Sequence, residues 1–330
     1  MDRRELLKLG ALAGGTFMFP ALSSVGNTKQ SQNETTNQGH IQLKLNQIEI
    51  LIFSDGHILL DDPQPIFAPD VRSADVKKEL RKIYLAEDKL ESAINVMLIK
   101  TAGRIILIDT GSGYHFGETG GWLSDNLQKS GIKVTDVTDV FITHAHIDHI
   151  GGIIRKNNTL VYPNAEYYLA KREYDFWMSN NPDFSKSKNP NSPKDSIGFA
   201  QNVLSSIKEK LNLFNYGDML FSCIKPELAE GHTPGHTVFT IFSGNKYIKH
   251  IVDTFHTPLL IAKPHWGTQW DVDFYKGIRT RKQILHNSYL NRTLVMTTHL
   301  PWPGLGYIGK TGSNYQWLPI AYFTPNDIVL

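Results

Sequence analysis

A short stretch of this 330-residue chain concentrates side chains that bind metal ions. Residues 143–152 read Thr-His-Ala-His-Ile-Asp-His-Ile-Gly-Gly, which places three imidazoles and a carboxylate within six residues. Imidazole nitrogen and carboxylate oxygen suit Zn²⁺ and similar first-row ions. A structural zinc site would more often use thiolates, and Cys223 is the single cysteine, expected as a buried thiol. The stretch therefore predicts a metal site, with a solvated histidine-rich loop as the alternative.

The spacing within this stretch separates its ligands into two pairs. His144 and His146 lie two residues apart, so in extended backbone they leave the same face and can share one ion. Asp148 and His149 are adjacent and cannot point the same way. Either they serve a second ion, or they turn with the chain into a following helix.

Further candidate ligands stand at the ends of strand-like apolar runs. A Gly- and Pro-rich turn at 231–237 holds two more histidines and opens onto the run 238–242. Because ligands in α/β folds cluster beyond the carboxyl ends of the strands, these segments are expected to converge on one site. The runs 104–108, 140–142, 246–252 and 293–298 lead into Asp109, the 143–152 stretch, Asp253 and His299, and the turn holds His232 and His236.

The order of these motifs resembles a known family. His-x-His-x-Asp-His, then Gly-His-Thr-Pro-Gly-His, a strand-end Asp and a late His are similar to the metallo-β-lactamase superfamily of hydrolases. Other landmarks, between residues 50 and 310, resemble methyl parathion hydrolase and its relatives in the lactonase-like branch. They are residues 92–99, 108–111, 115–117, 125–127, 175–177 and 299–306. The resemblance implies an α/β fold, an αββα sandwich of two mixed β-sheets flanked by helices.

The same resemblance assigns the ligands of two divalent ions, with Zn²⁺ expected. One ion would be held by His144, His146 and His232, the other by Asp148, His149 and His299, with Asp253 bridging both. Asp109 would orient a ligand imidazole by accepting its other N–H, unless it only forms the strand-end turn. The family pattern favours His232 over His236 as the ligand, so His236 is interpreted as a hydrogen-bonded support.

The chemistry implied is hydrolysis. Two neighbouring cations would hold a bridging water as hydroxide, with Asp253 between them, and would polarise a C=O or P=O group. Asp148 would accept the proton of the nucleophile, and His256 would donate to the oxyanion or leaving group unless it is an ordinary loop histidine. The substrate would be an ester, lactone or phosphotriester of an apolar small molecule. The alternative is a non-hydrolytic metal-binding or redox member of the fold, which would call for carboxylate-rich ligation and a flavin domain.

The lining of the substrate pocket is less constrained by the sequence. Phe116, Trp177 and Trp302 fall in segments that, by the resemblance, border the active site, where uncharged aromatic walls suit an apolar ligand. Large aromatic side chains also fill cores, so each of the three has that alternative. Trp122 lies on a short helical pattern and is interpreted as a core residue.

Composition sets the outer limits of the interpretation. The net charge of +2 argues against nucleic acid or an anionic membrane as a partner. Residues 40–330 can bury one large α/β core, which predicts a single domain. The sequence leaves a homodimer open. Within this domain, residues 179–193 predict a long polar loop, and the apolar spacing over 195–213 predicts an amphipathic helix.

The N-terminus resembles an export signal. Arg3 and Arg4 precede a short, glycine-containing apolar run at 9–19, so residues 1–24 resemble a twin-arginine signal. The polar residues 25–39 predict a disordered linker. We therefore expect an exported protein, periplasmic or extracellular, with no stable membrane insertion after signal removal. A retained membrane anchor is the alternative.

Overall fold

The computed structural model describes residues 39–321 and 327–329. The predicted signal segment and residues 25–38 of the predicted linker lie outside the described residues. Within the described ranges, no helix is both long enough and apolar enough to span a bilayer.

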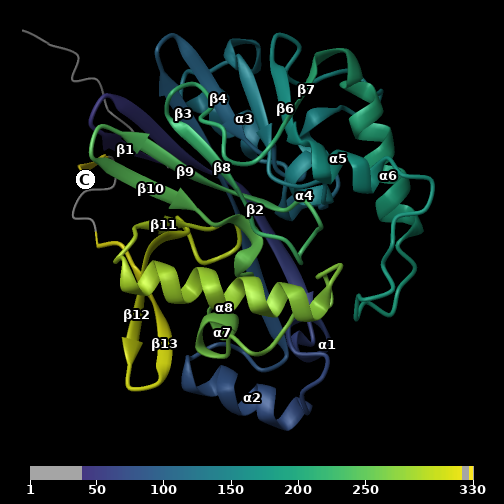
Figure 1. Cartoon of the computed structure of the whole chain (residues 1–330), viewed down its shortest axis with the longest axis vertical. Helices are drawn as coiled ribbons and strands as arrows, with labels where there is room; N and C mark the ends of the chain where they lie inside the picture. The colour runs from purple at the N-terminus through teal and green to yellow at the C-terminus, as the bar shows by residue number, and fades with distance from the viewer. Residues whose placement is uncertain (1–38, 322–326, 330) are drawn as a thin grey trace, which may run out of the picture. The chain divides into compact units, whose positions relative to one another are not determined.

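Two mixed β-sheets form the centre of the fold, which confirms the predicted fold class (Figure 1). The eight-stranded sheet has the order β14 (Asp327–Val329), β1 (His40–Leu45), β2 (Ile48–Asp61), β3 (Lys89–Thr101), β4 (Arg104–Ile108), β5 (Asp139–Ile142), β6 (Glu166–Ala170) and β7 (Leu211–Phe214). The six-stranded sheet has the order β13 (Asn314–Pro319), β12 (Leu305–Thr311), β11 (Val295–Met296), β10 (Lys246–His250), β9 (Thr237–Ser243) and β8 (Ile224–Leu228). Strands β4 to β7 run parallel, as do β10 and β11, and the pairs β1–β2, β2–β3 and β3–β4 are antiparallel.

The two-residue period of the strands divides their side chains between separate cores. In β2, Leu51 and Phe53 join one hydrophobic core, whereas Ile50 and Ile52 join another. The second of these cores also contains Ile241 of β9, so it lies between the two sheets. Because both faces of β2 are buried, its apolar run is nearly continuous, as expected for a strand inside a layered sandwich.

Helices cover the outer face of each sheet (Figure 1). The eight-stranded sheet is covered by α3 (Leu123–Lys129), α4 (Ile147–Ile150), α5 (Lys171–Trp177) and α6 (Lys194–Ser206). The six-stranded sheet is covered by α2 (Ser73–Lys82), α7 (Pro258–Ala262) and α8 (Phe274–Leu290), with α1 (Pro63–Phe67) in the same core. Short 3-10 turns complete the list: Gly117–Thr119, Val134–Asp136, Gly151–Ile153, Lys208–Lys210 and η5 (Val252–Thr254).

Several local predictions are confirmed and others are wrong. The loop over 179–193 has no helix or strand, and Cys223 is a buried free thiol. The predicted helix over 195–213 ends at Ser206, because residues 211–214 pair with β6 as the edge strand β7. The prediction of Trp122 as core is wrong: it is 39% exposed and its indole N–H reaches the Glu118 carbonyl.

Candidate metal centre

Three imidazole nitrogens from two separate loops face one another at the first ligand group. Nδ1 of His146 lies 3.0 Å from Nε2 of His144 and 3.0 Å from Nε2 of His232. Ligand nitrogens of a tetrahedral zinc ion are separated by about 3.4 Å, so this spacing is close to what one ion requires. Together with Asp253, these atoms form a group that could hold a metal ion.

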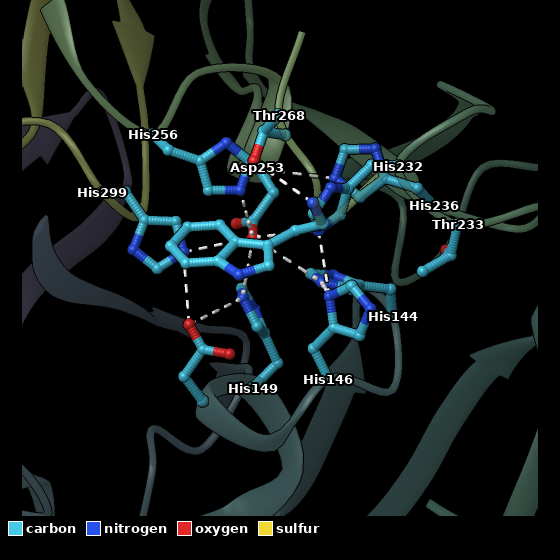
Figure 2. Close-up of polar contacts among 12 residues, drawn as sticks. His144, His146, His149, His232, Thr233, His236, Asp253, His256, Thr268 and His299 are labelled. Atoms are coloured by element: carbon cyan, nitrogen blue, oxygen red, sulfur yellow. Dashed lines mark hydrogen bonds and ion pairs between the residues drawn. The ribbon is translucent and has the colours of Figure 1, made fainter. Parts of the chain in front are cut away.

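The second ligand group shares Asp253 with the first (Figure 2). Nε2 of His299 lies 3.1 Å from Oδ2 of Asp253 and 3.2 Å from Oδ2 of Asp148. Nε2 of His149 lies 3.3 Å from the same Asp253 oxygen, as does Nε2 of His232 from the first group. One carboxylate oxygen therefore lies between the two sets of nitrogens, where a ligand common to both ions would stand.

Two buried atoms of these groups have no hydrogen-bond partner within the described structure. They are Nε2 of His149 and Oδ1 of Asp253. A buried polar atom without a partner is costly, so native structures seldom keep one without an ion, a water or a function to satisfy it. The donor set, five imidazoles and two carboxylates with no thiolate, suits divalent first-row ions. The residues therefore fit two divalent ions.

A short helical turn separates the ligands of the 143–152 stretch. His146 is the N-cap residue of α4, so Asp148 and His149 lie inside the turn and project differently from the extended residues before it. The Thr110 N–H donates to the His149 carbonyl, which ties this turn to the end of β4. A Cβ on Gly152 would stand 2.0 Å from the Thr110 carbonyl oxygen, so glycine is required for this approach.

Asp109 holds the same stretch from the neighbouring strand end. Its Oδ2 lies 2.8 Å from Nδ1 of His149, and its Oδ1 accepts the Thr143 backbone N–H at 2.8 Å. The backbone of Asp109 has φ +64°, a left-handed conformation that strand-end carboxylates adopt more readily than most residues. Asp109 thus stands where a carboxylate fixes the tautomer and direction of a ligand imidazole.

Asp271 performs the equivalent task for His232, although no sequence motif marks it. Its Oδ1 lies 3.0 Å from Nδ1 of His232, and its Oδ2 pairs with the Arg281 guanidinium at 3.2 Å. Arg281 is itself buried in α8 and donates to the carbonyls of Thr254 and Trp266. Asp271 lies in a loop that no strand-end pattern marks, so only the packing of α8 onto this loop reveals its role.

His236 belongs to neither ligand group. Its Nδ1 lies 3.0 Å from the Ala229 carbonyl, and its Nε2 accepts the Asp253 backbone N–H at 3.3 Å. Both ring nitrogens are therefore used within the protein. Burial lowers the pKa of His236 to about 3, so the ring is neutral and its single N–H points to the carbonyl. In this position His236 supports the loop that carries Asp253.

The ring of His256 lies beside Asp253, and neither of its nitrogens has a hydrogen-bond partner within the described structure. Its Nε2 is 3.3 Å from Oδ2 of Asp253, without hydrogen-bond alignment, and its ring stacks on that of His299 at 5.1 Å and 14°. Burial lowers the pKa of His256 to about 4, so this imidazole is neutral at physiological pH.

Opposite charges within the ligand groups raise the pKa of an imidazole and lower that of a carboxylate. Burial lowers the pKa of His299, but the carboxylates of Asp253 and Asp148 outweigh burial and raise it to about 10. Burial raises the pKa of Asp253, but the imidazoles of His149 and His299 outweigh it and hold that pKa well below its usual range. The ligands thus hold protons at neutral pH that an incoming cation must displace.

The three aromatic residues expected at the pocket differ in position. Trp302 is 39% exposed on the loop after His299. Trp177 is fully buried and its ring meets that of His146 edge-on at 5.8 Å. Phe116 is half-buried and packs against the outer core of the eight-stranded sheet. Contact of any of them with substrate stays a prediction.

A cavity of about 850 Å³ lies away from this centre. Asp55, Tyr114 and Arg155 are among its lining residues, and none of the seven predicted ligands lines it. The site is therefore identified by the convergence of its ligands and not by the size of a hollow.

Comparison with known proteins agrees with this geometry. A family model described as the metallo-beta-lactamase superfamily matches residues 91–248. Curated protein sequences gave no match. Among solved structures, AidC, a dizinc quorum-quenching lactonase in complex with a product, is 37% identical, with a TM-score of 0.82 over 87% of this chain and 99% of AidC.

Two further structures extend the comparison. The hydrolase AbOPH is 27% identical, with a TM-score of 0.77 over 87% of this chain and 99% of its own. A probable metal-dependent hydrolase from Staphylococcus aureus, 21% identical, shares the fold with a TM-score of 0.68 over 85% of this chain and 100% of its own. The chain therefore belongs to the metallo-β-lactamase superfamily, as a hydrolase of its lactonase-like branch with His/Asp groups for two divalent metal ions.

Proposed function

We propose that this protein is a dizinc lactonase, which hydrolyses the ring ester of an apolar lactone. The observation that carries the proposal is the single oxygen of Asp253 that lies within 3.3 Å of imidazole nitrogens from both ligand groups. Zinc suits this set because it accepts imidazole and carboxylate ligands in tetrahedral geometry. The similarity to AidC, a dizinc lactonase, supports the same metal and bond type.

When bound, two such ions would supply a Lewis acid for the carbonyl and a nucleophilic water of near-neutral pKa. The chain's own residues would hold the ions and manage the protons. Burial raises the pKa of Asp148, but His149 and His299 outweigh it and hold it below its usual range, so this carboxylate is ionised at neutral pH. It is also the most exposed of the carboxylates in the two groups, which places it to take a proton from the attacking water.

His256 would act as a hydrogen-bond donor to the oxygen that gains charge during attack. Its two ring nitrogens have no hydrogen-bond partner within the described structure, and the ring lies beside Asp253. Because burial keeps the imidazole neutral, it offers one N–H to an oxyanion without delivering a full proton. Asp253 would serve as the ligand shared by both ions.

The experiment that tests this proposal compares substrates on one preparation. Zinc-loaded enzyme is assayed with an N-acyl homoserine lactone, an aryl ester and an aryl dialkyl phosphotriester, with Asp253→Ala as the control. We expect kcat/KM to be highest for the lactone, and the Asp253→Ala variant to be inactive. A higher kcat/KM for the phosphotriester or the aryl ester would refute the lactone as the substrate class. Equal turnover by Asp253→Ala would refute the assignment of the shared ligand.

We also propose export through the twin-arginine pathway, on the paired Arg3 and Arg4 before the short apolar run at 9–19. The test is cell fractionation of the full chain beside an Arg3→Lys/Arg4→Lys variant. Wild-type protein should leave the cytoplasm and the variant should remain there. Equal distribution of both would contradict this route.

A further inference from the structure

Glu173 is a buried carboxylate near the metal centre that belongs to neither ligand group. It lies on α5 and its side chain is fully buried. Four donors surround it, all uncharged. Oε1 accepts the Ala145 backbone N–H at 3.1 Å and the Trp177 indole N–H at 2.6 Å, while Oε2 accepts the Thr233 hydroxyl at 2.6 Å and the Gly235 backbone N–H at 2.9 Å.

These partners connect Glu173 to both loops of the first ligand group. Ala145 stands between His144 and His146, and Thr233 follows His232. The two oxygens of one side chain therefore join the loop that carries two imidazoles to the loop that carries the third. The two loops are 86 residues apart at His146 and His232, so their spacing depends on tertiary contacts of this kind.

We propose that Glu173 is a positioning residue that sets the separation of the two histidine loops at the distance where their three imidazoles share one ion. This inference rests on the proposed metal function. Glu173 itself touches neither ion nor substrate.

The loop that follows His232 packs closely against the backbone of Glu173. A Cβ on Gly235 would lie 2.4 Å from the Glu173 backbone nitrogen and 2.6 Å from its Cβ, so only glycine permits the loop to approach α5 this closely. Trp177, one turn further along α5, donates to Glu173 and meets His146 edge-on. The carboxylate thus orders the helix, both loops and the indole beside His146.

A charged carboxylate suits this set of partners better than an amide. All four groups donate, and an ionised carboxylate only accepts, so every hydrogen bond is matched. The NH₂ group of a glutamine would face either the Ala145 N–H or the Gly235 N–H, leaving that backbone group without an acceptor. Burial raises the pKa of Glu173, and the four hydrogen bonds to its oxygens counter that rise in part.

The chain offers a matched control in Asp55. It is also fully buried and also accepts four hydrogen bonds from uncharged donors: the Ser112 N–H and hydroxyl and the backbone N–H groups of Gly121 and Leu123. None of these three residues adjoins a predicted metal ligand. Asp55→Asn therefore reports the general effect of damaging a buried carboxylate network.

The test is titration of metal-free protein with Co²⁺, followed by calorimetry and by the paramagnetically shifted imidazole N–H signals. The first ligand group should give three such signals and the second group two. We expect Glu173→Gln to weaken the three-imidazole ion about 10-fold and Glu173→Ala about 100-fold, and Asp55→Asn to leave it within about twofold. The second ion should change little in all three variants.

The outcomes separate this inference from the function on which it rests. Wild-type affinity for the three-imidazole ion in the Glu173 variants overturns the positioning role alone, as does an equal loss in Asp55→Asn. Failure of wild-type protein to bind two ions overturns the proposed function as well. If the Glu173 variants do not fold, Thr233→Val removes one of the four donors without changing side-chain shape, and it should weaken the same ion about threefold. No change in Thr233→Val would then refute the inference.

Discussion

The two sheets supply the metal centre in different ways. The eight-stranded sheet provides four ligands on one continuous segment, residues 144–149, at the end of β5. The six-stranded sheet provides three ligands on three separate loops: His232 before β9, Asp253 after β10 and His299 after β11.

The positioning partners differ accordingly. On the first side, Asp109 accepts from both Thr143 and His149, and Glu173 accepts from Ala145 between two of the ligands, so the segment is held as a unit. On the second side each ligand has its own partner: Asp271 for His232, the His236 ring for the Asp253 N–H, and the Ala93 carbonyl for Nδ1 of His299. Ligands that come from separate loops need separate supports, because no local backbone geometry links them.

The largest effect is expected where the two sides meet. Asp253→Ala removes the ligand common to both groups, so both ions should be lost or bound only weakly. We expect kcat/KM to fall by at least about 10³-fold and bound zinc to fall below one ion per chain. Elemental analysis and lactone hydrolysis measure this. Retention of two tightly bound ions would show that the two sides bind metal independently.

Mutation of the carboxylate that supports one ligand group should weaken the ion of that group alone. Asp271→Asn should weaken the ion of His144, His146 and His232, and Asp109→Asn should weaken the ion of the other group, each by about 10- to 100-fold. The same Co²⁺ titration that resolves the two ions measures both variants side by side. If each variant weakened both ions equally, Asp271 and Asp109 would not support separate ligand groups, and the comparison of the two sides would be wrong.

Ion binding should tighten as pH rises, and more steeply in one group. Burial lowers the pKa values of His299 and His149, but carboxylates outweigh it, so that the pKa of His299 is raised to about 10 and that of His149 well above its usual value. Each of these imidazoles, when metal-free, therefore holds a proton at neutral pH that the ion displaces. In the other group, burial keeps the pKa values of His144 and His146 well below normal. Only His232 of that group has a raised pKa, because Asp253 and Asp271 outweigh burial there.

Affinity for the second-group ion should therefore fall about 10-fold per pH unit for each proton displaced, as pH decreases below neutrality. Calorimetry in buffers of different ionisation enthalpy counts the protons released by each ion. Equal proton release by both ions would contradict the difference between the groups.

The smallest effect on metal binding and catalysis is expected from a residue that belongs to neither ligand group. Trp302 is 39% exposed on the loop after His299, so Trp302→Ala should leave both ions in place. If this indole contacts an apolar substrate, KM should rise roughly threefold to tenfold through lost apolar contact, with little change in kcat. Loss of zinc in this variant would instead show that the indole supports His299.

The sequence predicted the contiguous part of the centre well. The runs 104–108 and 140–142 are strands, and the candidate ligands at their ends lie at the same edge of the sheet, because parallel neighbouring strands end side by side. Of the strand-like run 293–298, only Val295–Met296 form a strand, yet His299 still lies within 3.1 Å of Asp253. The direction of a strand end therefore mattered more than the strand's length.

Two of the carboxylates that hold the ligand loops could not be predicted from the sequence. Asp271 and Glu173 lie in no recognisable motif, and both act through partners far along the chain. The choice between His232 and His236, four residues apart in one turn, rested on resemblance to a family. The structure shows the physical difference: both nitrogens of His236 are used by protein groups, whereas Nε2 of His232 faces His146 and Asp253.

The sequence by itself determined the ligand types, the two-residue spacing of His144 and His146, and the alternating strands that form layered sheets. These features are local, because they follow from side-chain chemistry and from backbone periodicity. The tertiary structure alone decided which separate loops meet, which carboxylate serves two groups and which buried side chains hold them there. Such contacts join residues tens to hundreds of positions apart, and only the packing of both sheets and their helices brings them within hydrogen-bond distance.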